Sequence, residues 1–470
     1  MLLSDVTLGL TGRRVDVLVE DGRVAAIEPA GSRPGGELRG GTLLPGLVDA
    51  HAHLLQWASA RQRVSLADAT SAAHAAELLA ARAPSAEWVY GANVHAGLWP
   101  DRPHKTLLDA ALPGRPVVVF SNDLHSVWLS SAALRLLGRD HPTGVFVEDE
   151  CMALTAALPA PALDVSDRWV LDATDAAAAR GVTTIADYEY TDTVADWTRR
   201  VAIRPPGTRI RCVIAKFLLD TTIERGHRTG DPLGEFLSVG PLKVFLDGSL
   251  NTRTAHCHDA PGVLLEPLEA LLPVLRRAVS QGISPALHAI GDHANTIALD
   301  AFAALGVGGR IEHAQLLRPE DLPRFAELGV VAGVQPAHAP DDRDVADRHW
   351  AGRTDRAYAF RSLWTAGARL EFGSDAPVAP LDPWDAIASA VTRTDDDRSG
   401  WHPEQALPLE VALAASTGGR VTVEVGDVAD LVLVGADLPI LPPDELREVP
   451  ITATLLAGRL THHAPWTDSI

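Results

Sequence analysis

The feature that most constrains the fold is an alternation, between residues 46 and 404, of apolar strand-like runs with helical stretches rich in Ala, Leu and Arg. Strands and helices that alternate in this way form a parallel sheet covered by helices. Eight such runs fit a closed (β/α)8 barrel, in which the working groups sit at the C-terminal ends of the strands. The run at 115–121 has an alternative place inside an insertion. The eight runs are 43–50, 115–121, 181–187, 240–247, 283–288, 309–313, 330–334 and 368–374.

The two ends of the chain differ from this middle part. They hold short strand-like runs, and the pair Asp21-Gly22 between two of them is a strong hairpin signal. Because the termini of a domain often lie close together, we expect a small composite β-sandwich domain built from residues 1–45 plus 405–470. It would accompany a distorted TIM-type barrel, of the α/β class, formed by residues 46–404. The strand-like runs at the ends are 15–20, 23–27, 429–434 and 451–456.

The stretch at about 55–165 is too long for an ordinary connection between a strand and a helix. It is rich in Trp, His and Pro, and aromatic and polar residues mix in this way in ligand pockets. We therefore expect an inserted subdomain that forms a lid over the barrel mouth. A peripheral subdomain is the alternative.

Charge and cysteine content exclude several classes of partner. The 470 residues carry a formal net charge of -20, which argues against a nucleic-acid or anionic-membrane partner. No apolar run reaches the length of a membrane span, and the N-terminus lacks the pattern of a signal peptide. The three cysteines, Cys151, Cys212 and Cys257, are widely spaced, which is typical of a reducing compartment. We expect a cytoplasmic protein with a small-molecule substrate.

Two histidines end the first barrel run. His51 and His53 close the stretch PGLVDAHAHL at positions i and i+2, where side chains on a strand point to the same face. They would converge on one point with the separation that a single metal ion needs. A pair of surface histidines at a strand tip is the alternative. Four further candidate ligands, each at the end of another apolar run, favour the metal site.

A single lysine lies inside the apolar run GPLKVFLDG. Burying an unpaired ammonium group is costly, so Lys243 requires an explanation. One interpretation is an ion pair with Asp247, which lies on the same strand face. The other is carboxylation of Lys243 by carbon dioxide, which places on its nitrogen a carboxylate able to bridge two metals. Burial lowers the pKa of a lysine and supplies the neutral amine that this reaction needs.

Three later runs also end in residues that bind metals. His288 closes one run, His313 closes the next, and Asp375 follows the last. Taken singly, each histidine is more often a core residue, and Asp375 could simply cap a helix. Together with the earlier residues they form an ordered set of two histidines, a lysine, two histidines and an aspartate.

With this set the chain resembles the amidohydrolase superfamily, and within it the branch of YtcJ-type proteins and N-substituted formamide deformylases (amidohydrolase family 3). The resemblance covers nearly the whole chain. It implies a distorted (β/α)8 barrel with a composite β domain, for which a homodimer is a common assembly, and one or two divalent metal ions. It rests on six separated motifs in the family's order: PGLVDAHAHL, LKVFLDGSLNTRTA, LHAIGDHA, RIEHAQ, FGSDAPV and GDVADLVLV.

The resemblance also assigns roles to the candidate ligands. It implies that His51 and His53 hold one metal together with Asp375, that His288 and His313 hold the other, and that carboxylated Lys243 bridges them. Zinc suits such mixed sites of histidine and carboxylate, although ligand type alone leaves manganese, iron and nickel open.

The ligands predict a metal-dependent hydrolase that cleaves an amide-type, non-peptide carbon–nitrogen bond. A metal-activated hydroxide would attack the substrate carbonyl, and Asp375 would act as general base and then general acid. A cyclic amide hydrolase or an amino-heterocycle deaminase of the same superfamily is the first alternative. A non-catalytic barrel scaffold is a second, disfavoured because all six ligand positions are filled.

The substrate itself is not given by these motifs. Candidate pocket residues are His125, Trp128, Glu148 and Arg253, for each of which ordinary packing or ion pairing is the alternative. The chain also departs from the family at Asn251, where a glycine is usual after GSL. That position lies in the loop after a ligand-bearing strand and bears on substrate choice.

Overall fold

The computed structural model describes residues 1–94, 99–121, 126–147, 150–151, 154–155, 157–260 and 262–464. The chain divides into two compact units. The first comprises Met1–Trp57 and Val170–Ile470, and the second is the inserted Ala58–Trp169.

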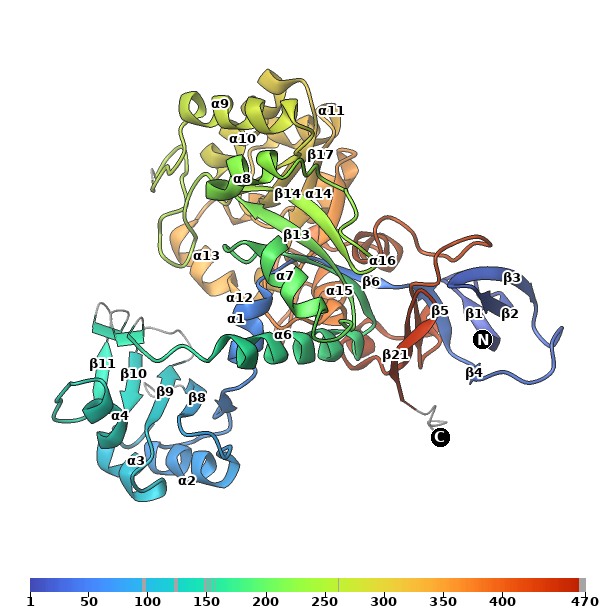
Figure 1. The fold of residues 1–470 in the computed structure, drawn as a ribbon. Helices are drawn as coiled ribbons and strands as arrows, with labels where there is room; N and C mark the ends of the chain where they lie inside the picture. The colour runs from blue at the N-terminus through green and yellow to red at the C-terminus, as the bar shows by residue number, and fades with distance from the viewer. Residues whose placement is uncertain are drawn as a thin grey trace. The chain divides into compact units, whose positions relative to one another are not determined.

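The first unit is built around eight parallel strands that follow one another in chain order, each paired with the next (Figure 1). The circle closes where the first and last strands meet: His53 donates its backbone N–H to the carbonyl of Ala376, and Asp375 donates to that of His51. The sheet is therefore a (β/α)8 barrel, as predicted. Its strands are β6 (Leu47–Ala52), β12 (Val182–Asp187), β13 (Arg209–Ala215), β14 (Leu237–Phe245), β15 (Pro285–Ala289), β16 (Gly309–His313), β17 (Val330–Val334) and β18 (Arg369–Phe372).

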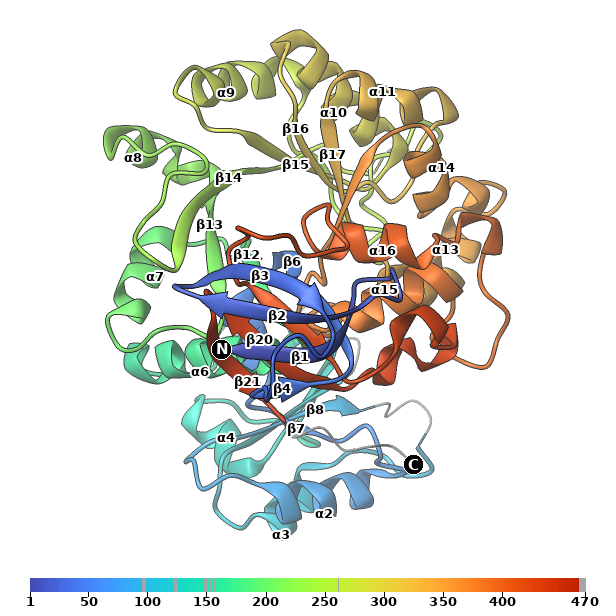
Figure 2. The same ribbon diagram turned by 90° about the vertical axis from the view of Figure 1, so that its right-hand side faces the viewer.

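Helices of the connecting segments surround the strands (Figure 2). Local capping sets several of their bounds: Asp382 caps α15 with Pro383 in its first turn, and Gly306 ends α10 in the left-handed conformation. Among the described residues, no helix has the length and apolar composition to cross a membrane. The helices are α1 (Leu54–Ala60), α6 (Leu163–Ala178), α7 (Thr193–Val201), α8 (Leu219–Glu224), α9 (Leu268–Ser280), α10 (Asp292–Leu305), α11 (Leu322–Glu327), α12 (His338–Asp341), α13 (Arg343–His349), α14 (Phe360–Thr365), α15 (Pro383–Thr392) and α16 (Leu409–Ser416), with short 3-10 helices that include η2 (Lys216–Leu218) and η7 (Pro443–Glu448).

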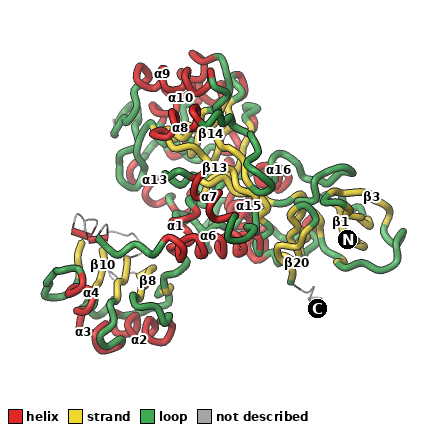
Figure 3. The backbone as a smooth tube through the Cα atoms, viewed as in Figure 1, coloured by secondary structure: helices red, strands yellow, loops and turns green. Residues whose placement is uncertain are grey.

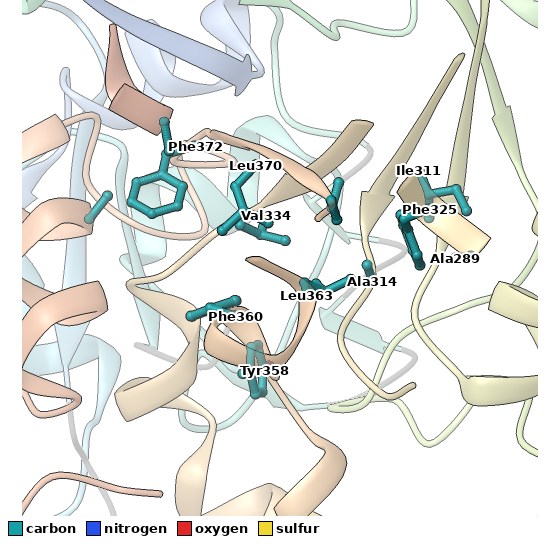
Figure 4. Packing of buried hydrophobic residues seen from close by; sticks show 14 of the residues in the cluster. Ala289, Ile311, Ala314, Phe325, Val334, Tyr358, Phe360, Leu363, Leu370 and Phe372 are labelled. Atoms are coloured by element: carbon teal, nitrogen blue, oxygen red, sulfur yellow. The ribbon is translucent and has the colours of Figure 1, made fainter. Parts of the chain in front are cut away.

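The main hydrophobic core fills the space between strands and helices. In the close view of Figure 4, side chains from β16, β17 and β18 lie near those of α11 and α14. Phe325 of α11 and Phe360 and Leu363 of α14 are at most 1% exposed. This packing fixes the strands, and with them the positions of their C-terminal ends.

Strands from both ends of the chain form a second, eight-stranded sheet, and β20 lies in it with β1 and β3 (Figure 3). The expected hairpin is present: Glu20 pairs with Arg23 across Asp21 and Gly22, which both have positive φ. The predicted composite domain is thus built from both termini, while α16 packs on β18 and β6 and so belongs to the barrel. The strands are β1 (Leu2–Leu8), β2 (Arg14–Glu20), β3 (Arg23–Pro29), β4 (Leu38–Arg39), β5 (Thr42–Pro45), β19 (Leu431–Val434), β20 (Ile451–Leu456) and β21 (Arg459–His463).

The inserted unit has its own five-stranded sheet and its own core. Its strands run in the order β11, β10, β9, β8, β7. The expectation that this unit is a lid over the barrel mouth stays a prediction. Its elements are β7 (Val64–Ser65), α2 (Ala72–Arg82), β8 (Val89–Val94), α3 (Lys105–Ala111), β9 (Val117–Ser121), β10 (Ser126–Leu129), α4 (Ser131–Leu136) and β11 (Val145–Val147).

One of the eight runs is not a barrel strand, and the alternative place given for it, inside the insertion, is confirmed. The run at 115–121 is β9, the central strand of the inserted sheet, and the missing barrel strand is β13. A central strand buried on both faces is apolar throughout in either sheet, so composition cannot tell the two apart. The run of β13 is interrupted by Arg209 and Arg211, and the ion pair of Arg209 with Asp430, at 2.7 Å, satisfies one of these charges.

Candidate active site

The six predicted ligands lie together at the C-terminal end of the barrel strands. They come from five strand ends, as the pattern of apolar runs predicts. The four imidazole rings form a continuous row: the centroid of His51 lies 5.6 Å from that of His53 and 5.1 Å from that of His313, which in turn lies 4.4 Å from that of His288.

Three of these residues meet the geometry of a metal site on their own. Ligand atoms of His51, His53 and Asp375 all lie within 4.8 Å of one another. The Oδ1 atom of Asp375 is 3.2 Å from His53 Nε2 and 3.6 Å from His51 Nε2. The Nε2 atom of His51 is buried and has no hydrogen-bond partner among the described residues. A buried nitrogen without a partner is costly, and a divalent ion between these atoms would satisfy it.

Three of the four histidines also have the outer partners that are typical of metal ligands, whereas Nδ1 of His53 is buried without a partner among the described residues. Nδ1 of His51 lies 2.8 Å from Glu312 Oε2, and Nδ1 of His313 lies 2.9 Å from Gln335 Oε1. His288 uses the opposite nitrogen, because its Nε2 lies 3.1 Å from the carbonyl oxygen of Gly248. Its Nδ1 is buried without a partner. In each of these three rings one nitrogen is thus bound to an acceptor that fixes the proton there, and the other is left for a ligand.

Lys243 lies at the same end of the barrel and is 1% exposed. Its Nζ atom lies 4.9 Å from the centroid of the Tyr188 ring and 4.8 Å from that of Phe245. Within the described part of the chain, no carboxylate lies in ion-pair distance of this ammonium group. Burial lowers the pKa of Lys243 to about 8, although the charges of Glu312 and Asp375 work against the shift. The side chain therefore supplies the neutral amine that carboxylation requires.

The ion pair between Lys243 and Asp247, offered as the structural interpretation of this lysine, is absent from the described contacts. Asp247 instead accepts hydrogen bonds from the backbone N–H groups of His256, Ile290 and Gly291, at 2.8 to 3.0 Å. It joins the loop after β14 to the turn that follows β15. Asp247 thus has a structural role that leaves Lys243 without a carboxylate partner.

A buried polar network supports the first histidine. Glu312 is fully buried and accepts hydrogen bonds from the hydroxyl of Tyr188, at 2.8 Å, and from Nε of Arg310, at 2.7 Å. Arg310 also pairs with Glu371 of β18. The Tyr188 ring stacks on that of His51, with centroids 3.8 Å apart. These contacts hold the imidazole plane from one face and from one edge.

A glycine makes room for this network. A Cβ atom on Gly333 of β17 would lie 2.3 Å from Oε2 of Glu312 and 2.9 Å from the guanidinium of Arg310. Because real Cβ atoms do not approach other atoms so closely, only glycine fits at this point of the strand while Glu312 faces His51.

The backbone at two of the strand ends is strained. His313 has φ of 76° and Asp375 has φ of 56°, a conformation that residues other than glycine rarely adopt. Asp49 secures the second of these turns, because its Oδ1 accepts from the N–H groups of His51 and Ser374, both at 3.1 Å. Strain of this kind gathers at functional sites, where the surrounding structure holds it in place.

Burial sets the protonation states of the ligands. It lowers the pKa of His51 to about 4 and that of His288 to about 3, with the charge of Lys243 acting in the same direction. For Asp375, burial alone would raise the pKa, but the hydrogen bond from His53 and the charges of His51 and His313 hold it well below its usual range. Near neutral pH His51 and His288 therefore present imidazole lone pairs and Asp375 a carboxylate, which are the forms that bind metal. His53 differs, because the hydrogen bond to Asp375 and the charge of Asp375 outweigh burial and raise its pKa.

The predicted substrate residues have different outcomes. Trp128 is 3% exposed and lies in the hydrophobic core of the inserted unit, so ordinary packing, the alternative given above, accounts for it. Arg253 is exposed in the loop after β14, with φ of 56°, and its role stays a prediction. His125 and Glu148 lie outside the described residues.

Several residues of the site were not predicted. Glu312, Gln335 and Tyr188 contact the ligand histidines and hold them in place. His338, at the start of α12, is buried, and its Nε2 has no partner among the described residues. Its charge lowers the pKa of Asp375. Glu312 had a signal, since it is a charged residue inside the apolar run RIEHAQ. The others had none, because polar residues that follow a strand are ordinary in loops.

Comparison with known proteins agrees with this geometry. A model of the amidohydrolase family matches residues 37–462. The chain is similar to YtcJ of Bacillus subtilis (28% identical, covering 90% of each chain) and to the N-substituted formamide deformylase of Arthrobacter pascens (26% identical, covering 95% of this chain and 94% of that one). Among solved structures, an uncharacterized metal-dependent hydrolase of Pyrococcus horikoshii shares the fold, with a TM-score of 0.80, 23% identity and coverage of 94% and 99%.

The family match, together with the barrel and its ligand-bearing strand ends, shows an enzyme of the hydrolase class that acts on carbon–nitrogen bonds. The chain belongs to the amidohydrolase family. The family, the fold and the enzyme class that the six motifs predicted are thereby confirmed.

Proposed function

We propose that this protein is a metal-dependent hydrolase that cleaves an amide-type, non-peptide carbon–nitrogen bond in a small molecule. The observation that carries the proposal is the arrangement of His51, His288 and His313, each with one ring nitrogen committed to an acceptor and the other available. The buried thiols Cys212 and Cys257 fit a cytoplasmic location. A homodimer, and the absence of nucleic-acid and membrane partners, remain predictions.

Two divalent ions, most consistent with zinc, fit the donor set. His51, His53 and Asp375 would hold the first, and His288 and His313 the second. Lys243 would carry the carboxylate that joins them, since it has no carboxylate partner of its own among the described residues and its charge lowers the pKa of histidines in both groups. When bound, the ions would supply a water activated near neutral pH and polarise the substrate carbonyl.

Asp375 is the group best placed to move protons. Its Oδ1 faces His53 and His51, and the depressed pKa keeps it ionised and able to accept the proton of the attacking water. The same carboxyl would then pass the proton to the departing amine, which cannot leave as an anion. A positioned base of this kind contributes about 10²–10⁴-fold to the rate.

The proposal is tested by elemental analysis followed by turnover on a substrate panel. The panel holds N-substituted formamides and acetamides, cyclic amides and amino-heterocycles, each assayed with metal-loaded protein. We expect roughly one to two divalent ions per chain and hydrolysis of the open-chain amides. Folded protein that has never met a chelator and holds no metal would contradict the proposal, and turnover confined to rings would replace it with the cyclic amide or deaminase alternative.

A further inference from the structure

Aromatic side chains from three consecutive barrel strands meet at the mouth of the barrel. Tyr190 follows β12, Phe217 lies in η2 after β13, and Phe245 is the last residue of β14. The Tyr190 ring centroid lies 5.2 Å from that of Phe217 and 5.7 Å from that of Phe245, edge-on in both cases. Phe245 lies 5.1 Å from the imidazole of His288. The three rings thus form a continuous row that begins at the ligands and runs outward.

The outer end of this row faces solvent. Tyr190 is 44% exposed and Phe217 is 61% exposed. Among the described residues only one other Phe, Tyr or Trp is exposed, Trp364 of α14, and the guanidinium of Arg361 covers its ring at 5.1 Å. Two of three exposed aromatic residues therefore contact each other beside the ligand set, without a cation over them. Exposed apolar surface that continues into a polar site is typical of a ligand-binding region.

The cation beside the exposed end of this row is already paired, while Lys243, over Phe245 at the inner end, belongs to the ligand set. Lys216, the neighbour of Phe217, forms an ion pair with Glu266 from the loop after β14. A charged substituent would find no unpaired partner in this pair, whereas a flat ring could stack on or meet the edges of the three aromatic side chains. The chemistry of the row therefore fits an uncharged aromatic group.

We propose that Tyr190, Phe217 and Phe245 form an aromatic arm of the active site that holds an uncharged aromatic group of the substrate. This inference rests on the proposed function for the place of the scissile bond beside the ligands. Because the arm begins 5.1 Å from His288, an aromatic group bound to it would lie close to the scissile bond of the substrate. The substrate class is therefore an amide with an aryl or arylalkyl substituent.

The arm is tested by ligand-observed NMR titration with benzamide and acetamide, two neutral amides that differ by one aromatic ring. In the wild-type protein we expect benzamide to bind about tenfold more tightly than acetamide, because contact with the arm removes part of the benzamide ring from water. In Phe217→Ala that preference should fall by about 2–10-fold, the usual worth of an aromatic pair. Trp364→Ala is the matched control, since it removes another exposed aromatic ring away from the row, and it should keep the wild-type preference.

Equal binding of the two amides by the wild-type protein, or an unchanged preference in Phe217→Ala, would overturn the arm. So would a large fall of the melting temperature in Phe217→Ala, because the ring would then be covered by another part of the protein. Repeating the titration on metal-free protein separates the two proposals, since ring contact needs no metal. A ring preference in a protein that binds no metal would contradict the proposed function alone, and hydrolysis without a ring preference would contradict the arm alone.

Discussion

Replacement of Glu312 by glutamine should lower the affinity of the protein for metal while the barrel still folds. The glutamine has the same size but only one accepting oxygen, whereas the carboxylate accepts from His51, Tyr188 and Arg310 at 2.7 to 2.8 Å. If the amide oxygen faces Tyr188 and Arg310, the amide N–H₂ faces Nδ1 of His51. The imidazole proton then moves to Nε2, the nitrogen that is needed for the metal.

The magnitude follows from the outer partners of metal ligands, whose loss usually costs about 10–100-fold in metal affinity or activity, or about 1.4–2.7 kcal/mol. Competition between the protein and a chelator for Zn²⁺ measures this cost directly. Glu371→Gln is the matched control, because it also removes a buried carboxylate from Arg310 but does not contact His51. We expect the control to lower the melting temperature while its metal affinity stays within a few-fold of the wild type. Equal losses of metal affinity in the two variants would refute a positioning role for Glu312.

Three further predictions concern Lys243 and Asp375. Lys243→Ala should lose metal and activity, with partial rescue by a small added carboxylate such as formate; full metal content in this variant would contradict the bridging role. With a pKa of about 8, roughly one Lys243 in ten is neutral at pH 7, against about one in 3,000 for an ordinary lysine. Uptake of labelled bicarbonate by metal-free protein should therefore fall about tenfold for each unit of pH well below 8, and uptake independent of pH would be inconsistent with this amine. Asp375→Asn should lose about 10²–10⁴ in turnover and little metal, whereas near-wild-type turnover in metal-replete protein would rule out Asp375 as the group that moves protons.

The candidate ligands could be predicted because their positions follow from a general rule of parallel barrels. Each apolar run is one strand, and all strands end at the same rim. Residues as distant in the chain as His51 and Asp375 therefore meet without any local signal that links them. The hairpin at Asp21-Gly22 was predictable for a similar reason, since its backbone conformation is one that few residues other than glycine, asparagine and aspartate adopt.

Other parts of the structure depend on partners that the sequence does not reveal. Glu312 serves a histidine that lies 261 positions earlier in the chain, and only the assembled barrel shows why a carboxylate is buried there. The strand β13 was not predicted because Arg209 and Arg211 break its apolar run. The partner of Arg209 is Asp430, which lies next to β19 in the composite domain, far along the chain. Trp128 appeared among the candidate pocket residues because an aromatic residue next to polar ones suits a pocket as well as a core.

In the proposed metal centre, Lys243 joins two ions. A crystal structure of the metal-loaded protein, with anomalous scattering measured at the metal absorption edges, tests it most directly. We expect anomalous peaks beside His51, His53 and Asp375 and beside His288 and His313, with extra density on the Nζ atom of Lys243 that reaches between them. A bare ammonium on Lys243 at full metal occupancy, or anomalous density elsewhere in the barrel, would contradict it.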